Sequence, residues 1–480
     1  MTKIFIFAIL SLIFIGCNNQ NKTEEYNPKQ HLEYTQKLNG YNLPKNKQGI
    51  ADRNPLVFNE DRYNVFEKDM TLGIQKFNYY WRDAENGSPS SSSLIECDNK
   101  HFLFPTNIEE KKSLGIQKYH CYNREFIDNW TSTFDFNSKH NIQTSVVLWT
   151  APSMYIDPGC EGFYFSMINT HLMEGCLPTP KHYEDYEDWI RFTAFKFGDN
   201  IDHYVVWNEV SSTNWTDSST SELTKSRMTT NLETSMNKTL SIYTELLKRT
   251  IRSVTALDHT CLGIDKDCKN LVYVSLDAGW YEDTPTFTTH DYGIHIDWKN
   301  VNVLNYIWSH LDFLEYPWAI AIHPYGAVYK PKQKSLNFNT LSEISIFQKE
   351  KIDKHNIDKL ISNNISPKFW LEYPQSRLFV NEQNVDGDNT IDEKTQFICE
   401  SYDVSFNRPE IIGITHNHFQ DNITTTYATY HTMLPPTIEA DFSNAYNFEP
   451  FLAYLSTSIN TWGKSNKHIC CQSYKLGCKY

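Results

Sequence analysis

The chain has 480 residues, of which 40% are hydrophobic and 21% are charged, so it can build a large core and is not globally disordered. Its formal net charge at pH 7 is -14, with 58 acidic against 44 basic residues. Lys and Arg are outnumbered and do not cluster, so we expect no nucleic-acid partner. The length fits two or three ordinary domains, or one α/β barrel with long insertions.

Residues 1–17 have the pattern of an export signal. Lys3 supplies a positive charge ahead of the apolar run from Ile4 to Gly16. The run is too short to span a bilayer as a stable helix and is typical of a signal peptide. Gly16 followed by Cys17 resembles a bacterial lipobox. We therefore expect a secreted or cell-surface protein, either cleaved near this point or lipidated on Cys17, its one expected contact with a membrane.

Ten cysteines remain when Cys17 is set aside, and an even number in an exported chain favours disulfides. Cys261 and Cys268 are close enough in sequence to form a short bridge. Cys160 and Cys176 could form another across a segment rich in Gly and Pro. Both pairs are predictions from spacing alone.

The C-terminal cysteines allow two interpretations. Cys470 and Cys471 are neighbours and are expected to pair elsewhere, one of them with Cys478. The alternative is a metal site built from these three cysteines and His468. A second paired-ligand motif is missing, and an oxidising compartment disfavours free thiols. Disulfides are therefore the favoured interpretation.

Strand-like and helix-like segments alternate along most of the chain. Residues 18–55 are polar, lack apolar periodicity and are expected to be a tether. Residues 56–480 alternate in the manner of a parallel sheet with helical crossovers. Helices are predicted over 124–138, 183–197, 237–255, 301–313, within 341–363, and over 393–406 and 448–462. Strands are predicted over 144–149, 203–207, 271–276, 318–323, 377–380 and 411–415.

A short repeat completes the strand count. Leu72–Phe77 recurs almost unchanged as Leu114–Tyr119, and we interpret the two copies as entries to two early strands. With them, the pattern predicts eight strand–helix units, which is a (β/α)8 TIM barrel forming a single catalytic domain. Long loops are predicted near 82–105, 151–181 and 211–236.

Polar and aromatic residues follow several predicted strands, where barrel enzymes place their chemistry. Two apolar strands end in a carboxylate, Glu209 and Glu382, which is costly unless the group is solvated, paired or used. Glycoside cleavage needs two carboxyls, one protonated to assist the departing oxygen and one ionised to attack or to activate water. The strand ends are Trp149, Asn208–Glu209, His323–Pro324–Tyr325, Asn381–Glu382–Gln383 and His416–Asn417–His418.

These strand ends resemble those of the clan A retaining glycoside hydrolases. Val205–Glu209 matches the clan's fourth strand, which ends in an Asn followed by the acid/base Glu. Leu378–Glu382 matches its seventh strand, which ends in the nucleophile Glu. The resemblance implies that Glu209 is the acid/base and Glu382 the nucleophile of a retaining enzyme.

The same resemblance implies contacts with the sugar. Asn208 would bind the 2-hydroxyl, and Tyr325 or His323 would orient the nucleophile. The clan's eighth strand often ends in a Trp platform, whereas this chain has His416 and His418 there. These two histidines are expected to contact sugar or a carboxylate.

Aromatic side chains supply the remaining candidate contacts. Trp149 and Trp280 are the candidate sugar platforms, although tryptophans at such positions also serve as core residues.

A second resemblance is to an uncharacterised domain family of secreted, mostly bacterial proteins. It is carried by Asn208–Glu209–Val210, by Tyr273–Asp277 with Trp280, by Ala321–Tyr325 and by Glu382–Gln383, in that order. The match spans roughly residues 60 to 420. It implies the barrel fold and leaves the substrate open.

Motifs of other enzyme classes do not occur in this sequence. It has no Gly-rich phosphate loop, no His-Glu-x-x-His and no Gly-x-Ser-x-Gly. We expect an exported, monomeric glycoside hydrolase with a carbohydrate substrate, no cofactor and no metal. Two alternatives remain: a surface barrel that binds glycans without cleaving them, and a metal-dependent exported hydrolase that uses His416 and His418.

Overall fold

The computed structural model describes the core of the chain in segments. Residues 1–17, the expected export signal, and most of the expected tether lie outside them. Among the described residues, no helix is long and apolar enough to cross a membrane. The segments are 48–52, 60, 63–64, 72–85, 101–105, 119–160, 163–165, 170–212, 216, 232–257, 271–276, 286–290, 293–298, 300–312, 316, 318–323, 354–363, 378–383, 391–406, 411–417, 449–457 and 461–479.

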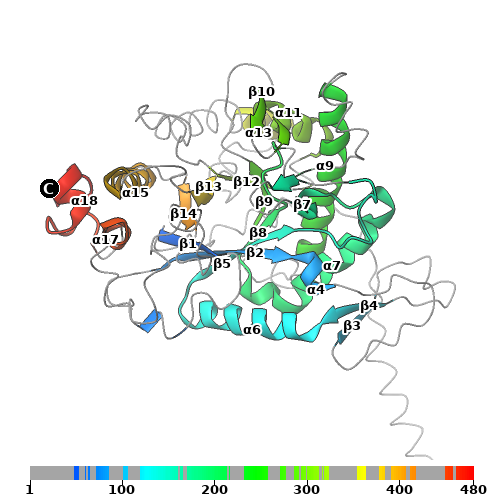
Figure 1. The fold of residues 1–480 in the computed structure, drawn as a ribbon, viewed down its shortest axis with the longest axis horizontal. Helices are drawn as coiled ribbons and strands as arrows, with labels where there is room; N and C mark the ends of the chain where they lie inside the picture. Colours follow the sequence, from blue (N-terminus) through cyan, green and yellow to red (C-terminus); the bar gives the residue numbers. More distant parts are fainter. Residues whose placement is uncertain are drawn as a thin grey trace, which may run out of the picture.

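Eight parallel strands close into a barrel, which confirms the predicted fold (Figure 1). Around the barrel the order is β1, β14, β13, β12, β9, β8, β5 and β2. Their C-terminal ends therefore meet at one rim. The bounds are β1 Gln48–Asp52, β2 Ile74–Tyr80, β5 Gln143–Trp149, β8 His203–Val206, β9 Leu271–Leu276, β12 Ala319–Ile322, β13 Leu378–Gln383 and β14 Ile411–Asn417.

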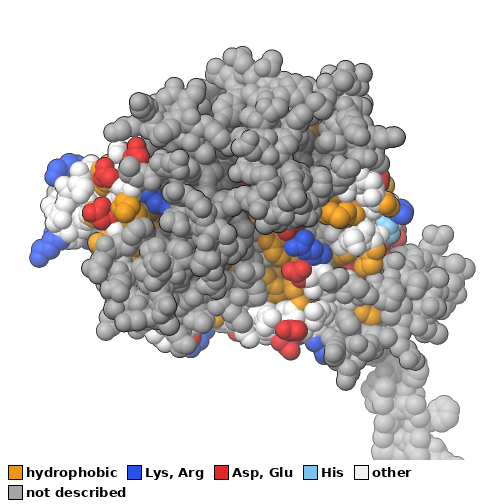
Figure 2. Space-filling model, viewed as in Figure 1, with side chains coloured by type: hydrophobic (Ala, Val, Ile, Leu, Met, Phe, Trp, Pro, Cys, Tyr) orange, Lys and Arg blue, Asp and Glu red, His pale blue; other side chains and the backbone are white. Residues whose placement is uncertain are grey.

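Helices surround this barrel. In Figure 1, α6 and α7 lie on one side, and α15, α17 and α18 gather at the edge beside β14. The helices are α4 Trp81–Ala84, α6 Arg124–Lys139, α7 Tyr183–Phe197, α9 Leu232–Leu257, α11 Asn300–His310, α13 Lys354–Ser362, α15 Ile391–Phe406, α17 Glu449–Ser456 and α18 Ile469–Tyr474. Short 3-10 helices are η3 Met173–Gly175, η4 Pro180–His182 and η5 Gly198–Asn200. On the face in Figure 2, acidic and basic side chains are interspersed over the C-terminal helices at the left.

Aromatic packing attaches α6 to the barrel. The side chain of Asn123 caps the helix by accepting a hydrogen bond from the Glu125 N–H at 3.0 Å. Trp130 lies one turn from other buried apolar residues, and its ring packs against Phe77 and Tyr79 of β2 at 5.3 and 5.2 Å between centroids. Burying such rings contributes about 2–3 kcal/mol each.

The lower half of the barrel interior is filled by large side chains. The rings of His203 on β8 and Tyr273 on β9 lie 5.3 and 5.7 Å from Phe379 on β13, across the barrel. His203 is also within hydrogen-bond distance of the Tyr273 hydroxyl and of Gln143, at 3.0 and 2.8 Å. Burial lowers the pKa of His203 to about 3, so this histidine is neutral. The layer closes the barrel opposite the rim.

The first barrel strand begins earlier than expected. β1 lies at 48–52, inside the segment assigned to the tether, so the barrel starts before residue 56. Only Ile50 and Ala51 are apolar in this strand, which is too weak a pattern to stand out. A Cβ at Gly49 would lie 2.7 Å from Thr415 and 2.9 Å from the carbonyl oxygens of Ile414 and Ile74. Glycine therefore lets β1 fit between β14 and β2.

The two copies of the repeat have different fates. The copy at 72–77 enters β2, a barrel strand, as predicted. The copy at 114–119 leads into β4, Tyr119–Asn123, which pairs antiparallel with β3, His101–Pro105, outside the barrel. The second copy is therefore not the entry to a barrel strand. Strand β4 packs on α7 instead, where the ring of Tyr122 stacks on that of Phe192 at 4.0 Å between centroids.

The long segments after the early strands contain local structure. The predicted loop at 82–105 includes α4 and β3. The predicted loop at 151–181 includes the antiparallel pair β6, Phe163–Phe165, and β7, Thr170–Leu172, and the disulfide Cys160–Cys176. Another antiparallel pair, β10 and β11, covers Thr286–His290 and Gly293–Asp297. Most of the predicted loop at 211–236 and the pair Cys261–Cys268 lie outside the described residues.

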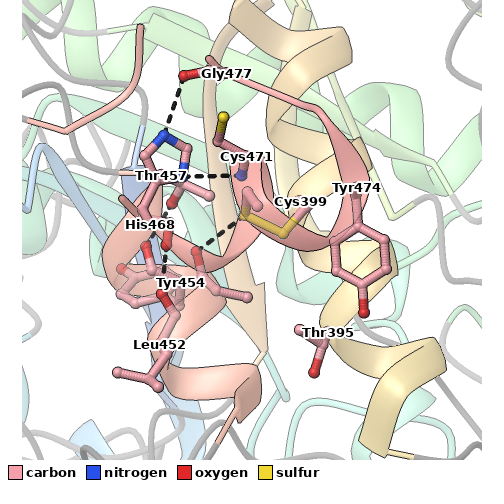
Figure 3. The surroundings of a disulfide bond; sticks show 12 residues. Thr395, Cys399, Leu452, Tyr454, Thr457, His468, Cys471, Tyr474 and Gly477 are labelled. Atoms are coloured by element: carbon pink, nitrogen blue, oxygen red, sulfur yellow. Dashed lines mark hydrogen bonds between the residues drawn. A yellow bond between two sulfur atoms is a disulfide. The ribbon is translucent and has the colours of Figure 1, made fainter. Parts of the chain in front are cut away.

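Two disulfides fasten the C-terminal segment, and Figure 3 shows the surroundings of the one that Cys399 forms. Cys470 bonds to Cys399 on α15, and Cys471 bonds to Cys478. The neighbours therefore pair elsewhere, as predicted, and the alternative metal site is ruled out because its sulfurs form disulfides. Cys121 is disulfide-bonded as well. His468 caps α18 by accepting from the Cys471 N–H at 3.2 Å.

We expect the long-range bridge to matter more than the local one. Cys399–Cys470 closes a sequence separation of 71 and Cys471–Cys478 one of 7. Loop-closure entropy predicts about 4 kcal/mol for the longer bridge and about 2 kcal/mol for the shorter. Paired Cys→Ala variants, compared by denaturant unfolding without reductant, should reproduce that order. An equal or reversed loss would contradict it.

Candidate active site

The fourth barrel strand, β8, leads into a tight turn that carries Glu209. The strand ends at Val206, and Trp207 and Glu209 then adopt left-handed backbone angles, with φ of 59° and 43°. This region costs a residue with a Cβ about 1–2 kcal/mol. Such residues persist only where their surroundings over-determine them, and they cluster at functional sites.

Both strands that flank β8 hold this turn. The Trp207 N–H donates to the carbonyl of Leu148 on β5 at 2.9 Å. On the other side, the Glu209 N–H donates to the hydroxyl of Ser275 on β9 at 3.1 Å. The Val210 N–H donates to the carbonyl of Ser275 at 2.9 Å. Three successive contacts thus compensate for the unfavourable backbone and fix where Glu209 lies.

The carboxyl of Glu209 meets the imidazole of His323. Glu209 Oε1 lies 2.7 Å from His323 Nδ1, and the two side chains are 7% and 0% exposed. The His323 N–H donates to the carbonyl of Leu276 at 3.0 Å, which fixes the residue just beyond β12. Two residues predicted for the site are therefore in direct contact. A solvated surface carboxylate, the ordinary interpretation of an Asn-Glu pair, does not fit this burial.

A bulge marks the strand that carries Glu382. On β13, Val380 and Gln383 pair with Ile414 and His416 of β14, so three steps on β13 oppose two on β14. The extra residue falls at Asn381 or Glu382. Bulges are common beside active sites, where they redirect a side chain. Glu382 thus occupies the C-terminal end of β13, on the rim shared with Glu209.

The side-chain partners of Glu382 lie outside the described part of the structure. The distance between the two carboxyls therefore stays a prediction. So does the expected orientation of Glu382 by His323 or Tyr325, because the contact seen for His323 is with Glu209. Tyr325, Trp280 and His418 lie outside the described residues.

Other expected contacts lie at the mouth beside β8. Asn208 is buried within the strained turn. Trp149 ends β5, and its ring lies 5.7 Å from that of Tyr80, which ends β2. Because Phe77 and Tyr79 pack outward on α6, strand alternation turns Tyr80 inward.

His416 lies on the outer face of the barrel wall, away from the barrel interior. It pairs with Ile50 of β1, two residues from the pair formed by Gln48 and Ile414, so it shares the face of Gln48. The Gln48 amide reaches outward to the carbonyl of Tyr454 on α17 at 2.6 Å. His416 therefore faces away from the barrel interior, where the contact expected of it would have to lie. Among the described residues, no group of three or more His, Cys, Asp or Glu is placed to hold a metal ion.

Tyr80 and Ser275 were not among the site residues predicted from the sequence. Tyr80 ends an apolar strand just as Trp149 does, and that position was the available signal. Ser275 stands in the strand Leu271–Leu276 that was recognised, but its role depends on the neighbouring turn. A contact of this kind has no signature in sequence.

Comparison with known proteins gives structural likenesses only. No protein-family model and no curated protein matches the chain. A family 39 glycoside hydrolase from Bacteroides cellulosilyticus WH2 shares 11% identity over 86% of this chain, with a TM-score of 0.48. This chain spans 64% of that enzyme's length. An endoglucanase of Thermotoga maritima shares 10% identity over 82% of this chain and 91% of its own, with a TM-score of 0.38.

A family 1 β-glucosidase from Thermotoga maritima is also similar, at 9% identity over 74% of this chain and 75% of its own, with a TM-score of 0.37. These structural neighbours are glycoside hydrolases. At such low identity and TM-score they carry no argument about activity. Membership of the uncharacterised domain family stays a prediction.

A second buried polar cluster lies near the ends of β2 and β5. Glu85, which follows α4, accepts hydrogen bonds from the Trp81 indole at 2.8 Å and the Tyr155 hydroxyl at 2.9 Å. Its carboxyl also contacts His120 Nδ1. On its other side, His120 Nε2 lies 3.4 Å from the carboxylate of Asp188 on α7. One histidine therefore stands between two buried acidic groups.

These carboxylates keep His120 charged. Burial opposes the imidazolium, but the Glu85 and Asp188 carboxylates outweigh it and raise the pKa of His120 to about 10. The cluster joins β4, α4 and α7, so its charge balance fastens the β3–β4 hairpin to the barrel.

We expect the stability contribution of His120 to fall at alkaline pH. Its folded pKa exceeds the unfolded value near 6.5, so the contribution is complete below about pH 6.5 and is lost as pH rises towards 10. Between pH 7 and 9 the slope should be about -1 kcal/mol per pH unit. Denaturant unfolding of wild type and His120→Gln should show their difference shrinking over this range. A difference that stays constant with pH would contradict the charged assignment.

Proposed function

We propose that the chain is a glycoside hydrolase that cleaves O-glycosidic bonds of an oligo- or polysaccharide with retention, using Glu209 as acid/base and Glu382 as nucleophile. The observation that carries the proposal is the buried Glu209, held against His323 in a strained turn at the barrel rim. The bulged end of β13 supports it by bringing Glu382 to the same rim. A glycoside hydrolase needs two carboxyls that face each other across the scissile bond.

The proposed reaction has two steps. In the first, Glu382 attacks the anomeric carbon while Glu209 gives its proton to the departing oxygen. In the second, Glu209 removes a proton from water, which attacks the same carbon and releases Glu382. The contact of His323 with Glu209 Oε1 favours transfer through Oε2. This mechanism requires the carboxyl groups to lie about 5–5.5 Å apart.

Neighbouring residues are proposed to hold the sugar. Asn208, beside the acid/base, would bind the 2-hydroxyl, and Trp149 and Tyr80 would bound the cleft on the β2–β5 side. Tyr325, Trp280 and His418 are proposed as further contacts. The layer of His203, Tyr273 and Phe379 fills the lower half of the barrel, so substrate is proposed to enter from the rim.

Export is proposed on the sequence of residues 1–17. A protein secreted or held at the cell surface, by a lipid on Cys17 in the second case, would meet extracellular glycans directly. The disulfides support this proposal, because they persist mainly in oxidising compartments. A monomer is proposed as well.

Loss of the nucleophile should abolish turnover. A panel of polysaccharides and 2,4-dinitrophenyl glycosides identifies substrates of the wild type. Glu382→Gln should then reduce hydrolysis below detection, because a neutral amide cannot form the covalent intermediate. Glu125→Gln, an exposed change on α6, is the matched control and should keep full activity.

The same panel separates the alternatives. Full activity of Glu382→Gln on a confirmed substrate would end the proposal. Glycan binding without turnover by the wild type would favour the binding barrel. Activity lost on chelation and restored by a divalent metal would favour the metal-dependent hydrolase.

Loss of the acid/base should depend on the leaving group. Glu209→Ala should slow poor leaving groups by about 10²–10⁴-fold, the usual contribution of general acid catalysis. Activated leaving groups need little protonation, so formation of the glycosyl-enzyme should survive. Azide should then raise turnover by attacking the intermediate, and the product should be a glycosyl azide of retained configuration. An inverted azide product would contradict retention.

A further inference from the structure

The ladder between β8 and β9 ends just before the acid/base turn. The strands are paired from His203 with Leu271 to Val206 with Val274. The Leu271 N–H donates to the carbonyl of Asp202 at 2.9 Å. In a parallel ladder this pattern repeats every two residues, so the last pair, Val206 with Val274, directs the Ser275 N–H towards the Val206 carbonyl.

A tyrosine hydroxyl from outside the barrel contacts both of these backbone groups. The Ser275 N–H donates to Tyr243 Oη at 3.4 Å, and the same hydroxyl donates to the Val206 carbonyl at 3.0 Å. Tyr243 comes from α9 and is fully buried. The hydroxyl thus joins α9 to both strands at the end of their ladder.

Ser275 connects Tyr243 to the turn that carries Glu209. Its N–H is satisfied by Tyr243, while its hydroxyl and its carbonyl accept hydrogen bonds from Glu209 and Val210. All three polar groups of Ser275 are therefore engaged, two of them by the turn. A chain of contacts leads from α9 through Tyr243 and Ser275 to the backbone of Glu209.

The phenol can keep this role over a wide pH range. Burial raises the pKa of Tyr243 far above its usual value of 10, against a smaller lowering by the Ser275 backbone. The hydroxyl therefore remains protonated and continues to donate to Val206. A water molecule could bridge the same groups, but it would not be anchored to a helix.

We propose that Tyr243 and Ser275 are positioning residues that hold Glu209 in the left-handed turn and its carboxyl against His323. The inference rests on the proposed function, since it assigns both residues to the acid/base step. Without the Tyr243 hydroxyl, the ends of β8 and β9 lose their hydrogen bonds to α9, and Ser275 is held less firmly beside the turn. Without the Ser275 hydroxyl, the Glu209 N–H loses its partner.

The kinetic test uses Tyr243→Phe and Ser275→Ala, which each remove one hydroxyl. Hydrolysis of phenyl glycosides should fall about 10–100-fold, a part of the full contribution of general acid catalysis. Hydrolysis of the matching 2,4-dinitrophenyl glycosides should change less than about 3-fold, because these leave with little proton assistance. A merely structural defect would lower both classes equally, and that result would overturn the inference.

The control is Tyr454→Phe. Tyr454 of α17 also donates its hydroxyl to a barrel carbonyl, that of Gly49 at 3.2 Å, but on the seam between β14 and β1. This variant should leave the ratio of the two substrate classes unchanged. A ratio that shifts as much as in Tyr243→Phe would show a general effect of tyrosine anchoring and would overturn the inference.

A second measurement does not depend on turnover. The ¹⁵N signal of His323, assigned by its disappearance in His323→Gln, reports the contact with Glu209. Tyr243→Phe and Ser275→Ala should shift this signal, and Tyr454→Phe should not. An unshifted signal in both variants overturns the positioning role, whereas a wild type that hydrolyses no glycoside defeats only the proposed function.

Discussion

The strained turn at Trp207 and Glu209 is the constraint on which the site depends. Two left-handed residues in three positions would not survive on an isolated strand end, because each lacks the freedom of glycine. They survive because β5 and β9 bind the turn from both sides. That support requires both neighbours at fixed spacing, and a closed barrel supplies it for every strand. The position of Glu209 is therefore a property of the whole barrel.

The surrounding helices contribute to this spacing through tyrosine hydroxyls. Tyr243 reaches the backbone of β8 and β9, Tyr402 of α15 donates to Ile414 on β14 at 3.2 Å, and Tyr454 reaches β1. Burial raises the pKa of Tyr243 and of Tyr402, so these phenols remain donors. Each joins an outer helix to a carbonyl in the barrel wall. The helices thus position strands by hydrogen bonds as well as by covering their apolar faces.

The sequence predicted best what depends on local pattern. The helix at 183–197 and the strand at 271–276 have the predicted bounds, because each is a long run of one periodicity. β1 was missed, since two apolar residues make no pattern. The copy of the repeat at 114–119 was misjudged because strand propensity does not show whether a strand joins the barrel or a hairpin. Partners of that kind are decided in three dimensions.

The site divides in the same way. Glu209 and His323 could be named because each follows an apolar strand, and strand ends meet at one rim. The roles of Ser275 and Tyr243 could not be predicted, because a serine in a strand and a tyrosine on a helix usually serve packing. Only the hydrogen bonds of their hydroxyls to the backbone of Glu209 and Val206 distinguish them.

Two buried histidines show how the surroundings decide whether an imidazole is charged. His203 lies in the lower layer among aromatic rings, and burial lowers its pKa to about 3, so it carries no charge. His120 lies near the rim between Glu85 and Asp188, which raise its pKa to about 10. The same side chain is neutral where only dipoles surround it and charged where carboxylates do. Burial alone therefore does not decide the charge of a histidine, because the partners that its surroundings supply decide it as well.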